Sequence, residues 1–263
     1  MLLAVDIGNT QSSVGVFEGE SLRCEVRLTT RRSWTRDEVA VALGQALSLR
    51  GLSLDEVSAA IVACVVPPAL RPLVEAVEEY AGCSPMVVGP GIKTGMPIRY
   101  EPVTDVGADR IVSAVAAHER YGDPGKTRGV IVVDFGTATT FDVVAPGPEY
   151  RGGVIAPGVG ISADALFSRA AKLPRVELKL PDKVIGRSTI GSLQSGLMYG
   201  YVSLVEGMVH RIRGELSWSA TVVGTGGLAQ IVSRSTDSVD VVDDQLMLEG
   251  LRLIYERNLS TRT

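Results

Sequence analysis

The sequence has few cysteines and few histidines. Its three cysteines, Cys24, Cys64 and Cys83, do not follow a disulfide-type spacing, which is typical of a protein from a reducing compartment and not of a small disulfide-stabilised domain. The two histidines, His118 and His210, lie far apart in the chain. A transition-metal site, which needs several closely spaced ligands, is therefore not expected.

Long apolar runs and clusters of basic residues are also lacking. A membrane-spanning helix needs about 20 consecutive apolar residues, and the apolar N-terminus already stops at Asp6 without a basic leader. We therefore expect a buried strand there, not a signal peptide, and a cytoplasmic protein with no membrane partner. The net charge is −4 and the basic residues are scattered, so a nucleic-acid partner is not expected.

Two stretches share one pattern, an apolar strand that ends in Asp-x-Gly and small polar residues. Residues 2–17 read LLAVDIGNTQSSVGVF, and residues 130–142 read VIVVDFGTATTFD. The aspartates, Asp6 and Asp134, are separated by 134 − 6 = 128 positions. Since domains typically have about 100–200 residues, a chain of 263 residues with this repeat favours two related halves.

These two turns have the chemistry of a phosphate site. Glycine allows a ligand to approach the backbone closely, and the amides and hydroxyls that follow can donate to phosphate oxygens. An aspartate would repel phosphate, so a magnesium or monovalent cation between Asp6 and Asp134 is implied. One Asp-x-Gly alone is common in ordinary β-turns, but two equivalent copies predict one site with a polyanion between them. The donors and glycines of the two turns are Gly8, Asn9, Thr10, Gly136, Thr137, Thr139 and Thr140.

The order of expected elements predicts an α/β protein. The first 28 residues predict a three-strand meander, and Thr35 with Glu38 forms a capping box at the start of a helix. The turn-rich stretch 122–129 is the expected domain boundary, which gives domains 1–121 and 122–263, with the last helix able to pack back on the first domain. Expected helices cover residues 35–50, 70–80, 111–121, 161–171, 189–213 and 246–256. Further strands cover residues 59–65, 86–88, 141–144, 152–158 and 220–223, and another strand starts at Val130.

A glycine-rich turn follows the strand 220–223. Its residues, Gly224, Thr225, Gly226 and Gly227, fit the start of a dinucleotide-binding motif. However, only 263 − 229 = 34 residues remain after the motif, which is too few to complete that fold. A turn that lets a purine lie close to the backbone is the functional interpretation, and a simple strand-to-helix turn is the alternative.

The stretch 89–107 is rich in glycine and proline and is expected to be a functional loop. It leads into Gly107, Ala108, Asp109 and Arg110 at a helix start. Asp109 could be only a favourable charge in the first helical turn, or it could take a proton from an alcohol that attacks a γ-phosphate. With Arg110 as an anion binder and Tyr100 upstream, the stretch predicts an acceptor-substrate pocket.

Together these motifs resemble type III pantothenate kinases. The resemblance is collinear over nearly the whole chain, and it includes the stretches KLPRVEL at 172–178 and STIGSLQSG at 188–196. The other motifs are DIGNT at 6–10, GADR at 107–110, DFGTATTFD at 134–142, GGVIAPG at 152–158 and VVGTGGLA at 222–229.

The resemblance implies an actin-like ATPase fold, in which two ribonuclease-H-like domains with mixed sheets flanked by helices close over ATP. It implies transfer of the γ-phosphate of ATP to pantothenate, which gives 4′-phosphopantothenate in the first step of coenzyme A biosynthesis. Family members use magnesium and require potassium or ammonium. The implied ATP-binding residues are Asp6, Gly8, Asn9, Thr10, Gly136, Thr137, Gly224, Thr225, Gly226 and Gly227.

The resemblance also assigns roles at the acceptor and cation sites. Asp109 is the implied catalytic base, Asp134 lies at the monovalent cation, and Asp6 is assigned to magnesium. A homodimer is implied, in which Thr189 reaches the partner's substrate pocket. The residues implied to bind pantothenate are Tyr100, Gly107, Ala108, Asp109, Arg110 and Thr189.

One departure concerns the first turn, because Gln11-Ser12-Ser13 follows DIGNT without a lysine. Cations and backbone amides must then neutralise the phosphates there. Two other functions stay open on the same fold: a nucleotide-gated regulatory protein, and a kinase for another small molecule or a sugar. A second polar pocket before Arg110 disfavours the regulatory protein, and a screen of acceptors separates the two kinases.

Overall fold

The computed structural model describes residues 1–259 except residues 124, 126 and 171. The chain divides into two units, one of Met1–Ala116 with Gln245–Thr263 and one of Ala117–Asp244. The first division falls within α3 (Ala108–Tyr121). The domain boundary expected after residue 121 stays a prediction, and two residues of the expected linker, 124 and 126, lie outside the described residues.

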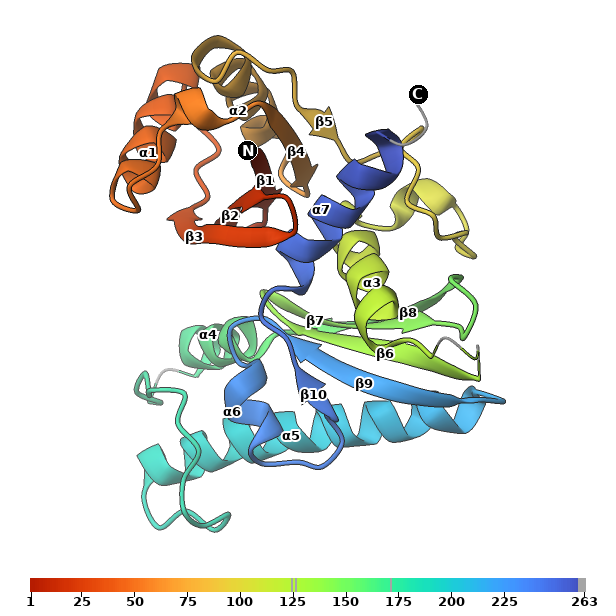
Figure 1. The fold of residues 1–263 in the computed structure, drawn as a ribbon. Helices are drawn as coiled ribbons and strands as arrows, with labels where there is room; N and C mark the ends of the chain where they lie inside the picture. The colour runs from red at the N-terminus through yellow and green to blue at the C-terminus, as the bar shows by residue number, and fades with distance from the viewer. Residues whose placement is uncertain (124, 126, 171, 260–263) are drawn as a thin grey trace. The chain divides into compact units, whose positions relative to one another are not determined.

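Unit 1 contains a five-stranded mixed sheet in the order β3-β2-β1-β4-β5 (Figure 1). The first three strands form the predicted antiparallel meander, and β4 and β5 run parallel to β1. Its strands are β1 (Leu2–Ile7), β2 (Gln11–Glu18), β3 (Ser21–Thr29), β4 (Ala59–Cys64) and β5 (Met86–Val87). Its helices are α1 (Arg36–Ser48), α2 (Pro67–Tyr80), the first part of α3 and α7 (Leu246–Leu259), with the 3₁₀ helices η1 (Leu54–Glu56) and η2 (Val103–Asp105).

Local signals explain where two of these helices begin. The predicted capping box of α1 is present, since the Glu38 amide donates to the Thr35 hydroxyl and the Thr35 amide donates to the Glu38 carboxylate. Helix α2 begins at Pro67, three residues before the predicted start. The prediction treated the proline pair as a break, whereas proline fits the first helical positions because its missing N–H is not needed there.

Both faces of this sheet are covered. Leu3, Val5 and Ile7 of β1 belong to a core cluster with residues of α1 and α2. On the opposite face, Gly15 of β2 lies so close to α7 that an added Cβ would be 2.9 Å from a methyl carbon of Leu248. Successive strand residues alternate between faces, so β1 and β2 present aliphatic side chains to one helical layer and a small residue to the other.

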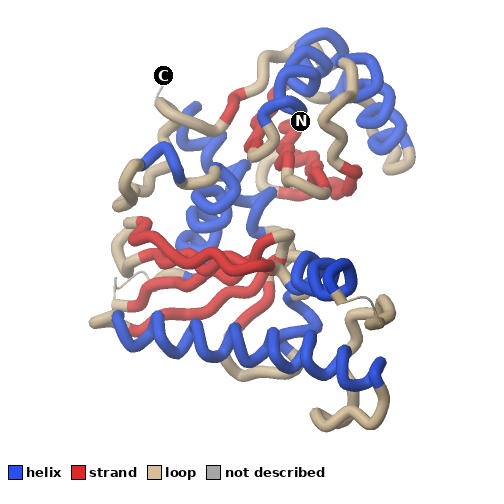
Figure 2. The backbone as a smooth tube through the Cα atoms, turned by 180° about the vertical axis from the view of Figure 1, so that it is seen from behind, coloured by secondary structure: helices blue, strands red, loops and turns tan. Residues whose placement is uncertain are grey.

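Unit 2 contains a second five-stranded sheet, in the order β10-β9-β6-β7-β8. Its strands are β6 (Arg128–Phe135), β7 (Ala138–Val144), β8 (Tyr150–Pro157), β9 (Ser219–Thr225) and β10 (Val241–Val242). Its helices are α4 (Val159–Arg169), α5 (Thr189–Glu215) and α6 (Ala229–Ser233). Helix α5 runs along one face of the sheet (Figures 1 and 2), where Tyr201, Val205 and Val209 join Ile131 and Val133 in one core cluster.

The two sheets have the same topology. Each has a three-strand antiparallel meander whose first strand also pairs in parallel with the strand that follows the next helical segment. The repeat recognised at the two Asp-x-Gly turns is therefore a repeat of the whole sheet, and the α/β prediction is confirmed. No helix in the described part of the chain is long and apolar enough to span a membrane.

Candidate active site

The two Asp-x-Gly sequences form equivalent hairpin turns. Between β1 and β2 the Gly8 amide donates to the Gln11 carbonyl at 3.2 Å, and between β6 and β7 the Gly136 amide donates to the Ala138 carbonyl at 3.1 Å. An added Cβ on Gly8 would be 2.8 Å from the Gln11 oxygen. The first turn therefore needs glycine for its close backbone approach.

Each turn places an aspartate beside exposed donors within its own unit. Asp6 in β1 and Asp134 in β6 are half-buried. Asp6 pairs across the hairpin with Ser13, and Asp134 pairs with Thr140. The segment between the paired residues is therefore one residue longer in the first hairpin than in the second. The residues at the tips of the turns, Asn9, Thr10, Gly136 and Thr137, are exposed. The predicted phosphate-binding groups are thus at the surface.

The structure also brings the predicted adenosine turn to Asp134. Strands β6 and β9 run parallel with Asp134 opposite Thr225. The next residue, Gly226, has a φ of +88°, and an added Cβ would be 2.4 Å from Oδ1 of Asp134 and 2.9 Å from backbone atoms of Phe135. Both the left-handed backbone and the contact require glycine. Unit 2 therefore holds two of the predicted nucleotide segments side by side.

A third segment at the second turn was not assigned a role from its own residues. The Gly158 amide donates to the Thr137 carbonyl at 3.1 Å, and an added Cβ on Gly158 would be 2.4 Å from that oxygen. Gly158 is the N-cap of α4. The positive end of a helix dipole therefore lies next to the exposed tip of the turn, where it favours an anion.

Tyr201 of α5 supports the second turn from inside. Its hydroxyl is hydrogen-bonded to the buried hydroxyl of Thr139, and its ring packs edge-on against Phe135 with centroids 6.1 Å apart. Burial raises the pKa of Tyr201 above its ordinary value, so the phenol keeps its proton. The sequence indicated only a core or interface role for this side chain, because its partner is 62 positions away.

A cavity of about 550 Å³ lies in unit 1 at the stretch that was predicted to form the acceptor pocket. Gly107 and Ala108 line it together with mainly apolar and glycine residues, and with Thr94 and Thr104, from the end of β4, the loop after β5 and the segment around η2. Representative lining residues are Cys64, Val65, Val88, Ile92, Ile98 and Ile111. Of the predicted substrate residues in the described chain, only these two line the pocket.

Asp109 lies in the first turn of α3, directly after these two lining residues. The Arg110 amide donates to its Oδ1 at 2.9 Å. An added Cβ on Gly107 would be 2.3 Å from the same oxygen. The carboxylate can therefore take this position only because residue 107 has no side chain. Burial raises the pKa of Asp109 above its ordinary value, against the lowering effect of the Arg110 amide and guanidinium. This is the direction that suits a proton acceptor.

The remaining predicted substrate residues have different surroundings. Arg110 is buried, with 7% of its surface exposed. Tyr100 is half-buried in the loop before η2, and Thr189 is exposed at the first position of α5 in unit 2. The expected helix start at residue 111 was three residues too late, since α3 begins at Ala108.

The equivalence of the two sheets relates the acceptor pocket to the adenosine turn. Asp6 lies opposite Ala63 in β4, and Asp134 lies opposite Thr225 in β9. Cys64 in the first unit therefore corresponds to Gly226 in the second. Each unit has its candidate ligand site at the carboxyl end of the same strand, which is the usual place for ligands in open α/β sheets.

The cation expected at the aspartates can be tested against the donor types. Within the described residues no group of three or more histidine, cysteine or acidic side chains is placed to hold a metal ion. Asp6 and Asp134 each lie beside turns with carbonyl and hydroxyl oxygens. Such all-oxygen surroundings fit a hard cation such as magnesium, which binds through one or two carboxylates and the phosphates of its substrate.

Comparison with known proteins assigns the family. The sequence profile of type III pantothenate kinases matches residues 2–211. A type III pantothenate kinase of Moorella thermoacetica is 50% identical over 258 residues, which cover 98% of this chain and 100% of that protein. Another, from Syntrophotalea carbinolica, is 51% identical over 98% of this chain and 99% of that protein.

Solved structures show the fold. A Campylobacter jejuni protein described as a member of the Baf family of transcriptional activators superposes with a TM-score of 0.61 at 18% identity, over 98% of this chain and 99% of that chain. A hexokinase of the ROK class from Thermus thermophilus superposes with a TM-score of 0.50 at 15% identity, over 99% of both chains. The actin-like ATPase fold is thus confirmed, and the chain belongs to the type III pantothenate kinase family.

Proposed function

We propose that this protein transfers the γ-phosphate of ATP to the primary hydroxyl of pantothenate, which gives 4′-phosphopantothenate in the first step of coenzyme A biosynthesis. The family supports the reaction. The observation that carries the residue assignment is a carboxylate with a raised pKa, Asp109, next to two residues that line an aliphatic pocket. Pantothenate has a dimethyl-substituted carbon beside its primary hydroxyl, and these methyl groups could pack against the apolar side chains of the pocket.

In the proposed reaction Asp109 is the general base. Its carboxylate accepts the proton of the primary hydroxyl as the hydroxyl oxygen forms a bond to the γ-phosphorus. The bond between that phosphorus and the β–γ bridging oxygen breaks, and ADP leaves. Such transfers depend mainly on positioning and charge stabilisation, and Tyr100, Gly107, Ala108 and Arg110 are assigned to orient pantothenate.

ATP is assigned to the turns of both units. Asp6, Gly8, Asn9 and Thr10 provide the first phosphate turn. The other assigned residues are Gly136, Thr137, Gly224, Thr225, Gly226 and Gly227. The absence of a lysine after the first turn and the exposed amides and hydroxyls favour neutralisation by backbone and cations. Asp6 would hold magnesium and Asp134 would hold potassium or ammonium, and these cations would offset the phosphate charge.

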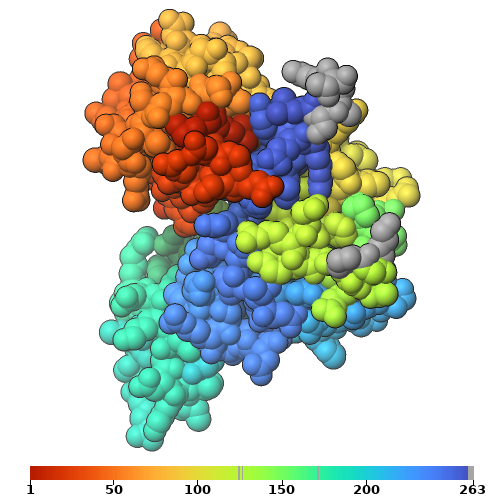
Figure 3. Space-filling model, viewed as in Figure 1, coloured from red at the N-terminus to blue at the C-terminus, as the bar shows by residue number. Residues whose placement is uncertain are grey.

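We further propose a homodimer in which Thr189 reaches the partner's substrate pocket. Apolar side chains are exposed on α4, at the start of α5 and just before it, and exposed apolar groups of this kind often mark interfaces. Figure 3 shows this part of unit 2 in teal at the surface. The exposed residues include Ile161, Leu166, Val184, Ile185 and Ile190. A cytoplasmic location stays a prediction from the cysteine usage and short apolar runs.

The activity is tested by measuring ADP release with a set of acceptors, with and without potassium. Pantothenate should be the best acceptor, and Asp109→Asn should lose most of the turnover, on the order of 10²–10⁴-fold for a general base. A better acceptor among sugars would replace pantothenate as the substrate. Measurable ATP binding without any phosphorylated acceptor would instead favour the regulatory protein.

The dimer is tested by complementation between two inactive variants. If Thr189 acts in the partner's pocket, a mixed dimer of Asp109→Asn and Thr189→Arg subunits has one intact site, with Asp109 from one subunit and Thr189 from the other. Mixing should therefore restore part of the activity. If Thr189 acts within its own subunit, every site in the mixture is damaged and the activity stays lost.

A further inference from the structure

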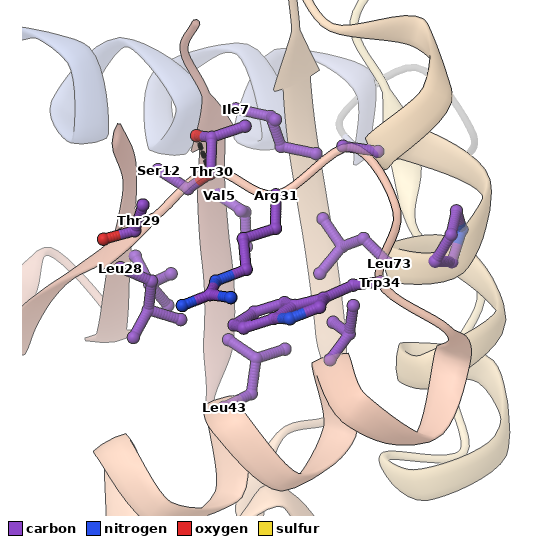
Figure 4. Close-up of a pocket in the computed structure, with 14 residues that line it drawn as sticks. Val5, Ile7, Ser12, Leu28, Thr29, Thr30, Arg31, Trp34, Leu43 and Leu73 are labelled. Atoms are coloured by element: carbon purple, nitrogen blue, oxygen red, sulfur yellow. Dashed lines mark hydrogen bonds between the residues drawn. The ribbon is translucent and has the colours of Figure 1, made fainter. Parts of the chain in front are cut away.

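A second, smaller cavity lies in the hydrophobic core of unit 1. It lies between the sheet and helices α1 and α2, with Trp34 beside it (Figure 4). Its volume is about 40 Å³, and a single water needs roughly 10–15 Å³. The cavity thus has room for a short branched alkyl group. Apolar side chains form most of the lining, among them Val5, Val14, Leu28, Leu43, Ala69 and Leu73.

The entrance of this cavity carries a positive charge. The guanidinium of Arg31 lies over the indole ring of Trp34, 5.6 Å from its centroid, and Figure 4 shows the two side chains next to each other. Within the described chain no carboxylate forms an ion pair with Arg31. The Glu38 carboxylate accepts hydrogen bonds from the Thr35 amide at 2.8 Å and the Thr35 hydroxyl at 3.0 Å. These hydrogen bonds lower the pKa of Glu38, and the charge of Arg31 lowers it further.

Three hydroxyls also line the cavity, those of Ser12, Thr29 and Thr30, and two of them have no proton for a ligand. The Thr30 hydroxyl donates to the Gly8 carbonyl at 2.7 Å. Because its single proton is used there, the contact of 2.9 Å between Ser12 and Thr30 must have Ser12 as the donor. The hydroxyl protons of Ser12 and Thr30 are therefore committed, Thr29 is exposed, and the charged donor at the entrance is Arg31.

From this arrangement we infer that the cavity is a binding site for a short aliphatic carboxylate. The alkyl chain fills the apolar space under Trp34, and the carboxylate accepts hydrogen bonds from the guanidinium of Arg31. A planar guanidinium pairs with a carboxylate through two parallel hydrogen bonds. An uncharged compound of the same shape would gain only the apolar contacts, so the site selects an anion with a small apolar tail.

Occupation of the cavity would act on the first Asp-x-Gly turn. Thr30 makes two hydrogen bonds to this turn. Its amide donates to the Thr10 carbonyl at 3.0 Å, and its hydroxyl donates to the Gly8 carbonyl. A ligand on Arg31 lies one residue from these bonds. This second step rests on the proposed function, in which the turn binds ATP, and it predicts that the carboxylate changes the KM for ATP.

Binding can be measured through Trp34. The chain has two tryptophans, so a Trp218→Phe background leaves Trp34 as the only indole fluorophore. Titration with 3-methylbutanoate should change its fluorescence in a saturable way, and 3-methylbutanamide should bind more weakly. Arg31→Gln should weaken carboxylate binding roughly tenfold or more, as expected for the loss of a charge-assisted hydrogen bond. Arg32→Gln should bind as the parent does, since Arg32 is exposed and does not line the cavity.

A cavity-filling variant gives an independent test. Ala69→Leu should abolish binding by occupying the apolar space, with circular dichroism as the check of folding. The site is overturned if the parent shows no saturable change, or if Arg31→Gln and the amide bind as tightly as the parent and the carboxylate. If binding occurs and an active kinase keeps its KM for ATP, the effect on the turn is overturned. If binding occurs without kinase activity, the proposed function fails and the site stands.

Discussion

A Cβ atom on Gly226 would lie 2.4 Å from Oδ1 of Asp134. The two residues are 226 − 134 = 92 positions apart, and parallel pairing of β9 with β6 brings them together. The aspartate assigned to a cation and the glycine assigned to adenosine are thus in direct contact. A substitution at either residue should therefore displace the other.

Gly226→Ala should impair ATP use strongly. The added methyl cannot fit unless Asp134 or the backbone of Phe135 moves, and a displacement of about 1 Å in a site of this kind can cost roughly 10²-fold in rate. We expect a higher KM for ATP and a higher potassium requirement, measured by steady-state kinetics over both concentrations.

Gly82→Ala is the matched control for Gly226→Ala. Gly82 also has a left-handed backbone, with a φ of +69°, but no atom lies within 4 Å of an added Cβ. This variant should lose about 1–2 kcal/mol of stability from the backbone conformation and keep its KM for ATP. Equal effects of the two variants on the KM would contradict a specific contact with Asp134.

The raised pKa of Asp109 predicts how activity depends on pH. A general base must be ionised, so kcat/KM should fall tenfold per pH unit below the pKa of Asp109 in the free enzyme. Because burial raises that pKa, the midpoint should lie above the ordinary aspartate value of about 3.9. Arg110→Gln should move the midpoint higher still, since the guanidinium lowers the pKa. A midpoint at or below the ordinary value would exclude Asp109.

The same shift predicts the stability of Asp109→Asn. A carboxyl group whose pKa is raised on folding binds its proton more tightly in the folded state, so its ionisation costs stability at a pH above its unfolded pKa. Asparagine does not ionise. The variant should therefore be at least as stable as the parent at pH 7, and this difference should shrink towards pH 4, as measured by urea unfolding. A variant that is clearly less stable at pH 7 would contradict the burial effect.

The sequence allowed most strands and the Asp-x-Gly turns of both sheets to be predicted because their signals are local. An apolar run, an Asp-x-Gly and a capping box each involve neighbouring residues, and β1, β6 and α1 were found with small errors at their ends. The short elements α6 and β10, with five and two residues, were missed. Elements of this length have too few residues for a periodic pattern.

The candidate site was predictable only in part, for a related reason. Asp109 and the glycines were visible because their neighbours in the sequence belong to the same motif. The contact of Gly158 with Thr137 and the hydroxyl pair of Tyr201 with Thr139 depend on segments that meet only in the folded chain. The lining of the acceptor pocket has the same origin, since it combines β4, the loop after β5 and the start of α3.

Asp243 connects the end of α3 to the adenosine turn. Its Oδ2 accepts a hydrogen bond from the Tyr121 hydroxyl at 2.7 Å and pairs with Arg120 at 3.0 Å. Its amide donates to the Gly224 carbonyl at 2.9 Å. The Asp243 carboxylate is buried. Burial of the Tyr121 phenol and its hydrogen bond to Asp243 raise the pKa of Tyr121 to about 12. The phenol therefore stays a donor throughout the physiological pH range.

Tyr121→Phe should therefore lower stability and weaken ATP binding together. Loss of the donor removes one hydrogen bond to a buried carboxylate, and hydrogen bonds to charged groups are worth about 1.5–3 kcal/mol. A shift of Asp243 should also displace Gly224. Urea unfolding and the KM for ATP measure the two effects. The control is Arg151→Gln, which removes a pair between the exposed Arg151 and the half-buried Glu149 and should cost about 1 kcal/mol or less. A destabilised Tyr121→Phe with an unchanged KM would restrict Asp243 to a structural role, because the displacement of Gly224 is what links it to the nucleotide.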